Sequence, residues 1–382
     1  MIAYLDNNAT TKCLPEVVSA MGFYLDRWYG NPSSLHQMGL ESRKAVEQVR
    51  LSIANLINSR NAASVYFTSC ATESIHMAFN CAHHALADKN YQIITTKADH
   101  VAVLSAAEYF SSKGAELVLL DVDKTGDLDL EQLRRVISQR PSFVSLMAAN
   151  NETGAILSLK KAAEICRDNN ALFHVDAVQA IGKLQIDCGE LQCHFLSISA
   201  HKFHGPKGVG ALYMSPKAPK CPFIFGHQEN GLRGGTENVA GIVGMGVAAE
   251  YAGKKLESVV TQVSELRNLL EKGLLQSVKN CEINGNPSNR ICNTSNIFFP
   301  NKNSAELIER LSARGIFASA GAACTNGGEP SHVIEAMGYS RERSNSSIRF
   351  SLSQFTTKQE IDYALEIIPE VVDSAMNVYS AV

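Results

Sequence analysis

The sequence predicts an α/β fold, with a mainly parallel sheet in a large domain and a smaller α+β domain towards the C-terminus. Between residues 64 and 214, short runs rich in β-branched residues alternate with helical stretches, a pattern typical of a parallel sheet covered by helices on both faces. After residue 241 the pattern changes to a long helical segment followed by isolated strands and further helices. A chain of 382 residues, 45% of them apolar, is long enough for one large and one smaller core.

The expected elements follow in order along the chain. We expect strands at 64–68, 91–96, 115–122, 142–149, 171–177, 195–199 and 210–214, separated by helices at 72–87, 101–114, 128–139 and 160–170. The C-terminal part should contain a helix from about 256 to 278, a strand at 296–299, a helix at 304–314, a strand at 347–352 and a final helix. Thr357 and Glu360 have capping-box spacing at the start of that last helix. We therefore expect a large domain at 15–258 and a small domain built from 1–14 and 259–382.

Charge and composition point away from several classes of function. The net charge is −3 and no block of Lys and Arg stands out, so nothing indicates a surface for nucleic acid or membrane. The first residues lack the basic and apolar regions of a signal peptide, and no 18-residue apolar stretch follows. We expect small-molecule chemistry in the cytoplasm.

The cysteines and histidines do not form a recognisable metal or disulfide pattern. The ten cysteines are scattered and include no CxxC pair, which argues against a zinc knuckle and against a disulfide framework. His201 and His204 are close in sequence, but no carboxylate or cysteine nearby completes a ligand set. No metal site is expected.

Two loops at strand ends carry candidate binding residues, because ligands of open parallel sheets gather at the carboxyl ends of the strands. The loop 67–74, "FTSCATES", leads from a strand into a helix, and its backbone N–H groups with the Thr72 hydroxyl suit a phosphate. In 171–180, Asp176 follows an apolar strand and Gln179 comes three residues later; such an aspartate could hold a protonated ring nitrogen. Simple helix caps remain the alternative at both places.

Two further loops carry candidate reactive side chains. In "SISAHKFHGPKGVGALY", Lys202 follows a buried strand, where desolvation of an ammonium is costly and a depressed pKa would suit a Schiff base. A lysine that extends to the surface is the alternative. The glycine-rich stretch after it lacks the spacing of a Walker motif. In "ASAGAACTNGGEPSH", Cys324 lies among small residues, where we expect an accessible, reactive thiol or else a structural cysteine.

With these loops in one order, the chain resembles the cysteine desulfurases of the NifS/IscS family, which are pyridoxal 5′-phosphate (PLP) enzymes of the class V aminotransferase group and of PLP fold type I. The matching motifs span nearly the whole chain: "YLDNNATT" (4–11), "GNPSSLH" (30–36), "ATES" (71–74), "DHVAVL" (99–104), "NNETG" (150–154), "HVDAVQ" (174–179), "HKFHGPKGVGALY" (201–213), "RGGTEN" (233–238), "AGAACT" (320–325) and "IRFSL" (348–352).

The resemblance implies a role for each matched position. The catalytic residues would be Lys202, as the Schiff-base lysine, His100, stacked on the cofactor ring and assisting proton transfer, and Cys324, as the nucleophile. The remaining residues would bind ligands: Asp176 at the pyridinium nitrogen, Gln179 at the ring hydroxyl, Ala71, Thr72, Ser199 and His201 at the phosphate, Asn151 at cofactor or substrate, Arg349 at the substrate carboxylate, and Thr236 at the phosphate of the neighbouring subunit.

The resemblance also implies a reaction and partners. L-Cysteine would be converted to L-alanine, with the sulfur left as a persulfide on Cys324 and passed to an acceptor protein, most commonly for iron–sulfur cluster assembly or for thio-modification. The enzyme would be a homodimer without direct contact to nucleic acid or membrane. A selenocysteine lyase or a related PLP-dependent β-eliminating lyase is the alternative.

Three departures from the family pattern accompany the resemblance. Cys70 stands where many relatives have glycine, Ile75 and His76 replace a more polar pair, and the loop that carries Cys324 is about one residue shorter. The first two change packing near the expected phosphate. The third changes how far Cys324 reaches.

Overall fold

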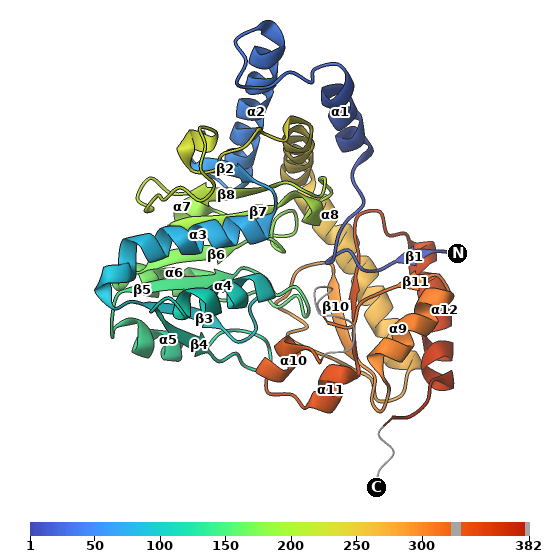
Figure 1. Ribbon diagram of the computed structural model, residues 1–382. Helices are drawn as coiled ribbons and strands as arrows, with labels where there is room; N and C mark the ends of the chain where they lie inside the picture. Colours follow the sequence, from blue (N-terminus) through green and yellow to red (C-terminus); the bar gives the residue numbers. More distant parts are fainter. Residues whose placement is uncertain (322–329, 379–382) are drawn as a thin grey trace.

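A seven-stranded sheet forms the centre of the larger part of this computed structural model, which describes residues 1–321 and 330–378 (Figure 1). The strand order is β2-β8-β7-β6-β5-β3-β4. The strands are β2 (Val65–Thr68), β3 (Gln92–Thr96), β4 (Glu116–Leu120), β5 (Ser142–Met147), β6 (Leu172–Asp176), β7 (Phe195–Ser199) and β8 (Gly210–Met214). β8 runs antiparallel to β2 and β7, and the other pairs are parallel. The predicted mainly parallel sheet is confirmed.

Both faces of this sheet are buried, because alternate residues of each strand enter different hydrophobic cores. Phe143 packs with the core under α3 (Ala71–Leu86) and α4 (Val101–Ser111), whereas its neighbour Val144 packs with the core on the opposite face. The helices α5 (Leu130–Ile137) and α6 (Leu159–Asp168) contribute to that opposite core, and the short α7 (Cys188–Leu191) precedes β7.

Three of the longer helices differ from the sequence prediction. The helices α1 (Pro15–Asp26) and α2 (Gln37–Leu56) were not expected, and the helix expected from about 256 is the second half of the 39-residue α8 (Val239–Ser277). Glycines weaken the helical pattern in the first half of α8, yet they permit close packing. A Cβ at Gly244 would lie 2.8 Å from Met21 of α1, and one at Gly246 would lie 2.5 Å from Val49 of α2.

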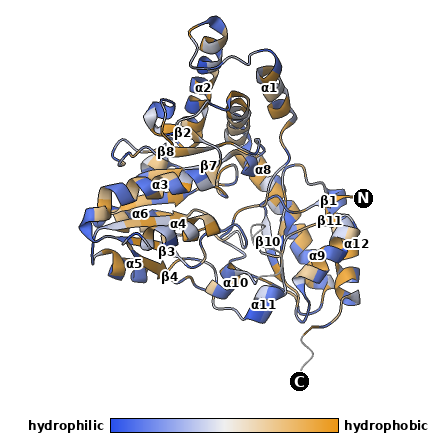
Figure 2. Ribbon diagram, viewed as in Figure 1, coloured by the Kyte–Doolittle hydropathy of each residue, from blue (hydrophilic) through white to orange (hydrophobic). Residues whose placement is uncertain are grey.

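The C-terminal part has its own core. Its antiparallel sheet has the order β12-β10-β9, formed by β9 (Glu282–Ile283), β10 (Thr294–Phe298) and β12 (Ser347–Ser351). Its helices are α9 (Ser304–Ala313), α10 (His332–Ala336), α11 (Arg341–Asn345) and α12 (Lys358–Ser374). Figure 2 shows hydrophobic and hydrophilic residues alternating along α9 and α12, as expected for helices with one buried face. The predicted capping box of Thr357 and Glu360 is confirmed.

The N-terminal segment connects the two parts. β1 (Ala3–Tyr4) pairs in parallel with β11 (Ile316–Phe317), and Ala3 and Leu5 belong to the C-terminal core. A few residues later, the backbone N–H of Thr11 donates to the carbonyl of His201, 3.0 Å away, beyond the end of β7. Among the described residues, no helix has both the length and the apolarity needed to cross a membrane.

Candidate active site

One pocket of about 180 Å³ lies where the N-terminal segment and β12 meet the carboxyl ends of β5, β6 and β7. It is lined by Asn8, Ala9, Cys70, Ala71, Thr72, Ile75, His100, Met147, Ala149, Asn151, Asp176, Val178, Gln179, Ser199, His201, Lys202 and Arg349. The structure therefore brings together all but two of the site residues expected from the sequence. Thr236 lies in a different hollow, beside Arg233 and Gly208, and Cys324 lies outside the described residues.

Lys202 lies in the short 3-10 turn Ala200–Lys202 that directly follows β7. Its Nζ donates to the carbonyl oxygens of Asn8, at 2.6 Å, and of Ala9, at 2.9 Å. The N-terminal segment therefore provides two acceptors for the ammonium of Lys202, a residue that lines the pocket. The carbonyl of Asn8 also accepts a hydrogen bond from Gln179 Nε2, at 3.0 Å.

The N-terminus of α3 provides a site for an anion. Cys70 is the N-cap residue but its side chain makes no capping hydrogen bond. The first turn of the helix, with Ala71 and Thr72 and the positive end of the helix dipole, lines the pocket without a side-chain cap. The Thr72 hydroxyl adds a donor at the pocket wall. Ser199, buried at the end of β7, lines the same pocket.

The acidic residue in the first turn of α3 is neutralised by an arginine. Glu73 Oε1 accepts from Arg233 Nε at 2.7 Å, and Glu73 Oε2 accepts from the backbone N–H of Ser69 at 2.7 Å. Burial opposes ionisation of Glu73, but the hydrogen bonds from Arg233 and Ser69 outweigh it and hold its pKa below the ordinary value. The ion pair reduces the repulsion that this carboxylate would exert on a second anion at the same helix end.

The buried carboxylate of Asp176 lies at the end of β6. Its Oδ1 accepts from the backbone N–H of Val178 at 2.9 Å. The pKa of Asp176 is raised to about 6, chiefly by burial and also by the nearby charge of Asp99, while the hydrogen bond from Val178 and the charge of Lys202 oppose the rise. A cation in the pocket beside Asp176 would favour its ionised form.

His100 is the N-cap residue of α4, and its ring has one defined tautomer. Its Nδ1 accepts from the backbone N–H of Ala102 at 3.1 Å, so the proton of the neutral ring lies on Nε2. Burial, together with the charges of Lys202 and His332, lowers the pKa of His100 to about 4. Near neutral pH the ring is therefore uncharged and holds one proton at the pocket wall.

His201 is also neutral near pH 7. Its pKa is lowered to about 4 by burial and by the charges of Lys202, Lys207 and Lys183. Its Nδ1 lies 3.1 Å from the Thr10 hydroxyl, and when that hydroxyl donates, the other ring nitrogen carries the proton and is a donor.

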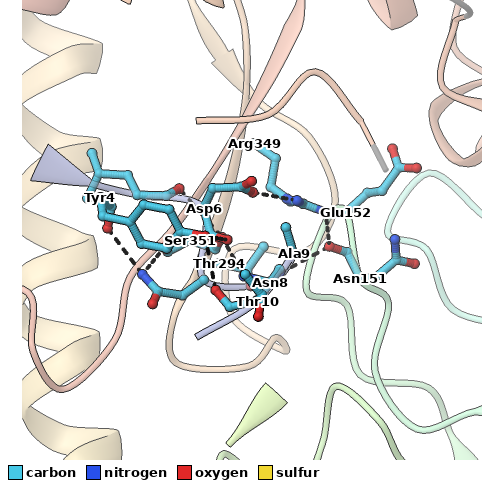
Figure 3. A network of polar contacts seen from close by, with 12 residues as sticks. Tyr4, Asp6, Asn8, Ala9, Thr10, Asn151, Glu152, Thr294, Arg349 and Ser351 are labelled. Carbon is cyan, nitrogen blue, oxygen red and sulfur yellow. Dashed lines mark hydrogen bonds and ion pairs between the residues drawn. The ribbon is translucent and has the colours of Figure 1, made fainter. Parts of the chain in front are cut away.

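Arg349 is held by two groups on different segments, as Figure 3 shows. Its side chain is 1% exposed; Nη2 pairs with Asp6 Oδ1 at 2.7 Å, and Nη1 donates to the carbonyl of Asn151 at 3.0 Å. Arg349 Nε and Asn151 Oδ1 are buried without a hydrogen-bond partner among the described residues. Two residues that line the pocket thus hold a buried donor and a buried acceptor without hydrogen-bond partners in the described part of the chain.

Sequence reasoning assigned no role to two residues that support this site. Asp99 is fully buried beside Asp176; its Oδ2 accepts from Thr95 and from both the backbone and the hydroxyl of Thr96, and its Oδ1 accepts from the backbone N–H of Met147. Asp6 pairs with Arg349 across 343 residues of sequence. Both lie inside motifs that the sequence analysis quoted, but only the fold gives their partners.

Comparison with known proteins identifies the family. A family model for aminotransferase class-V matches residues 3–364. Over 377 residues the chain is 42% identical to cysteine desulfurase NifS of Azotobacter vinelandii, covering 98% of this chain and 94% of that protein. The chain belongs to the NifS-like cysteine desulfurases of the class-V aminotransferase family.

Other relatives agree with this class-V assignment. Cysteine desulfurase 1 of Trichormus variabilis is 42% identical over 374 residues, covering 97% of this chain and 93% of that protein. A solved structure described as a NifS-like protein superposes with a TM-score of 0.92 at 38% identity, covering 98% of this chain and all of that one. A structure of SspA in complex with cysteine has a TM-score of 0.81 at 28% identity, covering 93% of this chain and all of that one. Fold type I is thus confirmed, and the cofactor of this family is PLP.

The pocket fits PLP in its donor set. It offers an amine at Lys202, an anion site at the N-terminus of α3, a buried carboxylate at Asp176 and an amide N–H group at Gln179. These groups correspond in charge and hydrogen bonding to the aldehyde, phosphate, ring nitrogen and ring hydroxyl of PLP.

Proposed function

We propose that the chain is a PLP-dependent cysteine desulfurase that converts L-cysteine to L-alanine and retains the sulfur as a persulfide on Cys324. The observation that carries this proposal is the single pocket in which Lys202, Asp176, His100 and Arg349 meet at the carboxyl ends of the strands. Membership in the NifS-like cysteine desulfurases supports the same reaction.

Three residues would hold the reactive end of PLP. Lys202 would attach it covalently, Asp176 would face its ring nitrogen, and Gln179 would reach its ring hydroxyl. When bound, PLP supplies an electron sink for removal of the substrate α-proton. The ionised form of Asp176, favoured by a ring cation, would keep that ring nitrogen protonated. His100 would stack on the ring and hold a proton on Nε2, from which it can donate to the substrate.

The phosphate would bind at the N-terminus of α3. The backbone N–H of Ala71, the hydroxyls of Thr72 and Ser199 and the ring of His201 would donate to it. In a homodimer, Thr236 of the neighbouring subunit would complete this set. The neutral state of His201 supports the assignment, because a neutral ring with a proton at the pocket side donates without adding a desolvated charge.

Arg349 and Asn151 would orient the substrate. A guanidinium binds a carboxylate through parallel N–H groups, and Arg349 is already anchored through Asp6 and the Asn151 carbonyl, with its Nε unpaired in the described part of the chain. The amide of Asn151 would contact the cofactor or the substrate. This arrangement would hold the substrate carboxylate at one end of the pocket.

Sulfur transfer would proceed through Cys324. Its thiolate would bond to the substrate sulfur as the carbon–sulfur bond breaks, so that alanine leaves and the sulfur remains as a persulfide. An acceptor protein then receives this sulfur, and we propose iron–sulfur cluster assembly or thio-modification as its use.

We also propose that the protein is a cytoplasmic homodimer. Residues 15–258 would form the PLP domain, and residues 1–14 together with 259–382 would form the small domain.

The test is a measurement of alanine release from L-cysteine, with protein-bound persulfide trapped, for the PLP-loaded protein and for Cys324→Ala. We expect the wild type to form both products and Cys324→Ala to form neither, while both bind PLP. Release of alanine from selenocysteine that survives Cys324→Ala, with little release from cysteine, would replace the proposal by a selenocysteine lyase.

A further inference from the structure

A second lysine lies immediately behind the active-site pocket. Lys183 follows β6 in the turn that carries Gln179, and only 8% of its surface is exposed. It does not line the pocket itself. An ammonium removed from water to this degree is costly unless it is paired or used.

The ammonium of Lys183 is bound to Gln179 alone in the hydrogen bonds that the structure gives. Nζ donates to the backbone carbonyl of Gln179 and to its side-chain Oε1, both at 3.2 Å. On the other side of the amide, Gln179 Nε2 donates to the carbonyl of Asn8 at 3.0 Å. The same carbonyl accepts from Lys202 Nζ at 2.6 Å. The four residues therefore form a continuous polar chain from the buried ammonium to the active-site lysine.

This series of hydrogen bonds fixes the orientation of the Gln179 amide. An ammonium has only donors and a carbonyl only acceptors. If the amide turned over, its NH₂ group would face the ammonium of Lys183 and its oxygen would face the carbonyl of Asn8. Both contacts would be repulsive, and the ammonium of Lys183 and the carbonyl of Asn8 would each lose one of their hydrogen-bond partners. Because Lys183 cannot accept a hydrogen bond while it is protonated, the amide has one favourable orientation.

We propose that Lys183 is a positioning residue that keeps the N–H groups of Gln179, rather than its carbonyl, directed towards the cofactor site. The inference rests on the proposed function, because it concerns the group that meets the ring hydroxyl of PLP. A donor at that position stabilises the ionised ring oxygen. A carbonyl there would repel it.

The charge of Lys183 acts in the same direction. Burial lowers the pKa of Lys183 to about 8, and repulsion from Lys202 contributes to the lowering, whereas Cys292 opposes it. The group therefore remains largely protonated near neutral pH. The titratable groups that interact with it are Lys202, Cys292, His201 and His204. When PLP is bound, a buried cation behind its ring hydroxyl would favour the ionised oxygen and would disfavour a proton on the nitrogen through which Lys202 holds the cofactor.

Lys183→Met tests the inference in the full-length protein, because methionine has a similar length but neither the charge nor the donors. We expect the equilibrium dissociation constant for PLP to rise about tenfold, the equivalent of one lost hydrogen bond to a charged group. We also expect the near-visible absorbance of the bound PLP to titrate at a higher pH, because both the donor and the cation that favour the unprotonated form are lost. Unfolding of the PLP-free protein is measured in parallel.

Two further variants keep the test decisive. Lys207→Met is the matched control, because Lys207 is exposed and its charge acts on His201, but it is not hydrogen-bonded to Gln179 in the described part of the chain. The PLP affinity and titration of this variant should equal those of the wild type. Gln179→Glu retains a partner for Lys183 but offers no N–H group, so it should shift the titration in the same direction as Lys183→Met even if that variant folds poorly.

The outcomes separate the inference from the proposed function. A Lys183→Met protein with wild-type affinity and wild-type absorbance titration overturns the inference while the wild type still binds PLP and releases alanine. A shift of equal size in Lys207→Met also overturns it, because any nearby charge would then suffice. A wild-type protein that binds no PLP overturns the proposed function itself.

Discussion

Replacement of Asp6 by asparagine should destabilise the protein far more than the loss of a surface charge does. Asp6→Asn removes the anionic partner of Arg349, whose side chain is 1% exposed, while the Asp6 side chain is 19% exposed. The arginine would keep one acceptor, the carbonyl of Asn151, and its Nε already has no partner among the described residues. The substitution therefore leaves a buried cation with little compensation.

The size of the effect follows from the burial of the two partners. Removal of one partner of a fully buried ion pair costs about 3–5 kcal/mol. Asp6 retains some contact with solvent and asparagine still offers an acceptor, so we expect a loss of about 2–3 kcal/mol in the free energy of unfolding. By contrast, removal of an exposed pair costs less than about 1 kcal/mol.

Urea denaturation of the PLP-free protein at neutral pH measures this difference directly. Asp362→Asn is the matched control, because it breaks the Lys358–Asp362 pair, whose side chains are 68% and 51% exposed. If Asp6→Asn and Asp362→Asn lower the free energy of unfolding by the same amount, Arg349 obtains its compensation from another group, and the reasoning from burial is refuted.

Three other predictions address the site and its pH dependence. If Thr236 serves the neighbouring subunit, mixed dimers of Lys202→Ala and Thr236→Ala contain one intact site, and their alanine release should exceed that of either variant alone; no gain on mixing would place Thr236 in its own subunit's site. Arg233→Met should weaken PLP binding about tenfold in equilibrium titrations, because it leaves the charge of Glu73 unpaired at the anion site, and unchanged affinity would contradict that role. Burial lowers the pKa of His174 from 6.5 to about 3, so the unfolded state binds the proton more readily and stability is lost as the pH falls between these values; His174→Gln should flatten this part of the unfolding profile, and an unchanged slope would assign the acid sensitivity elsewhere.

The sequence predicted best where local pattern and tertiary structure agree. The strands and helices between residues 64 and 214 were confirmed because short apolar runs such as 142–147 form strands that are buried on both faces. The first half of α8 was missed because its glycines oppose helix formation locally, and packing against Met21 and Val49 compensates. The antiparallel direction of β8 was also beyond a pattern that reports period but not direction.

The candidate site likewise contains residues that the sequence could locate and residues that it could not. Lys202, Asp176 and the loop before α3 could be located because each directly follows a strand, and such loops meet at one edge of a parallel sheet. The hydrogen-bond partners of Arg349 and Lys202 could not be located from the sequence. Asp6 is 343 residues from Arg349, and Asn8 is 194 residues from Lys202. The sequence also does not predict how side chains are oriented. The Gln179 amide oxygen faces the ammonium of Lys183, and only the fold brings these two groups together.

The path of the N-terminal segment has a mechanical consequence. The segment is hydrogen-bonded at one end to the strand that carries Arg349, through Asn7 and Ser351, and at the other to the turn that carries Lys202, through Thr11 and His201. The two carbonyls that hold Lys202 lie between these anchors. Any rotation of the C-terminal part against the central sheet would therefore displace the carbonyls that accept from Lys202. A few peptide units of the N-terminal segment thus couple the position of Arg349, the proposed ligand of the substrate carboxylate, to that of Lys202, the proposed ligand of the cofactor.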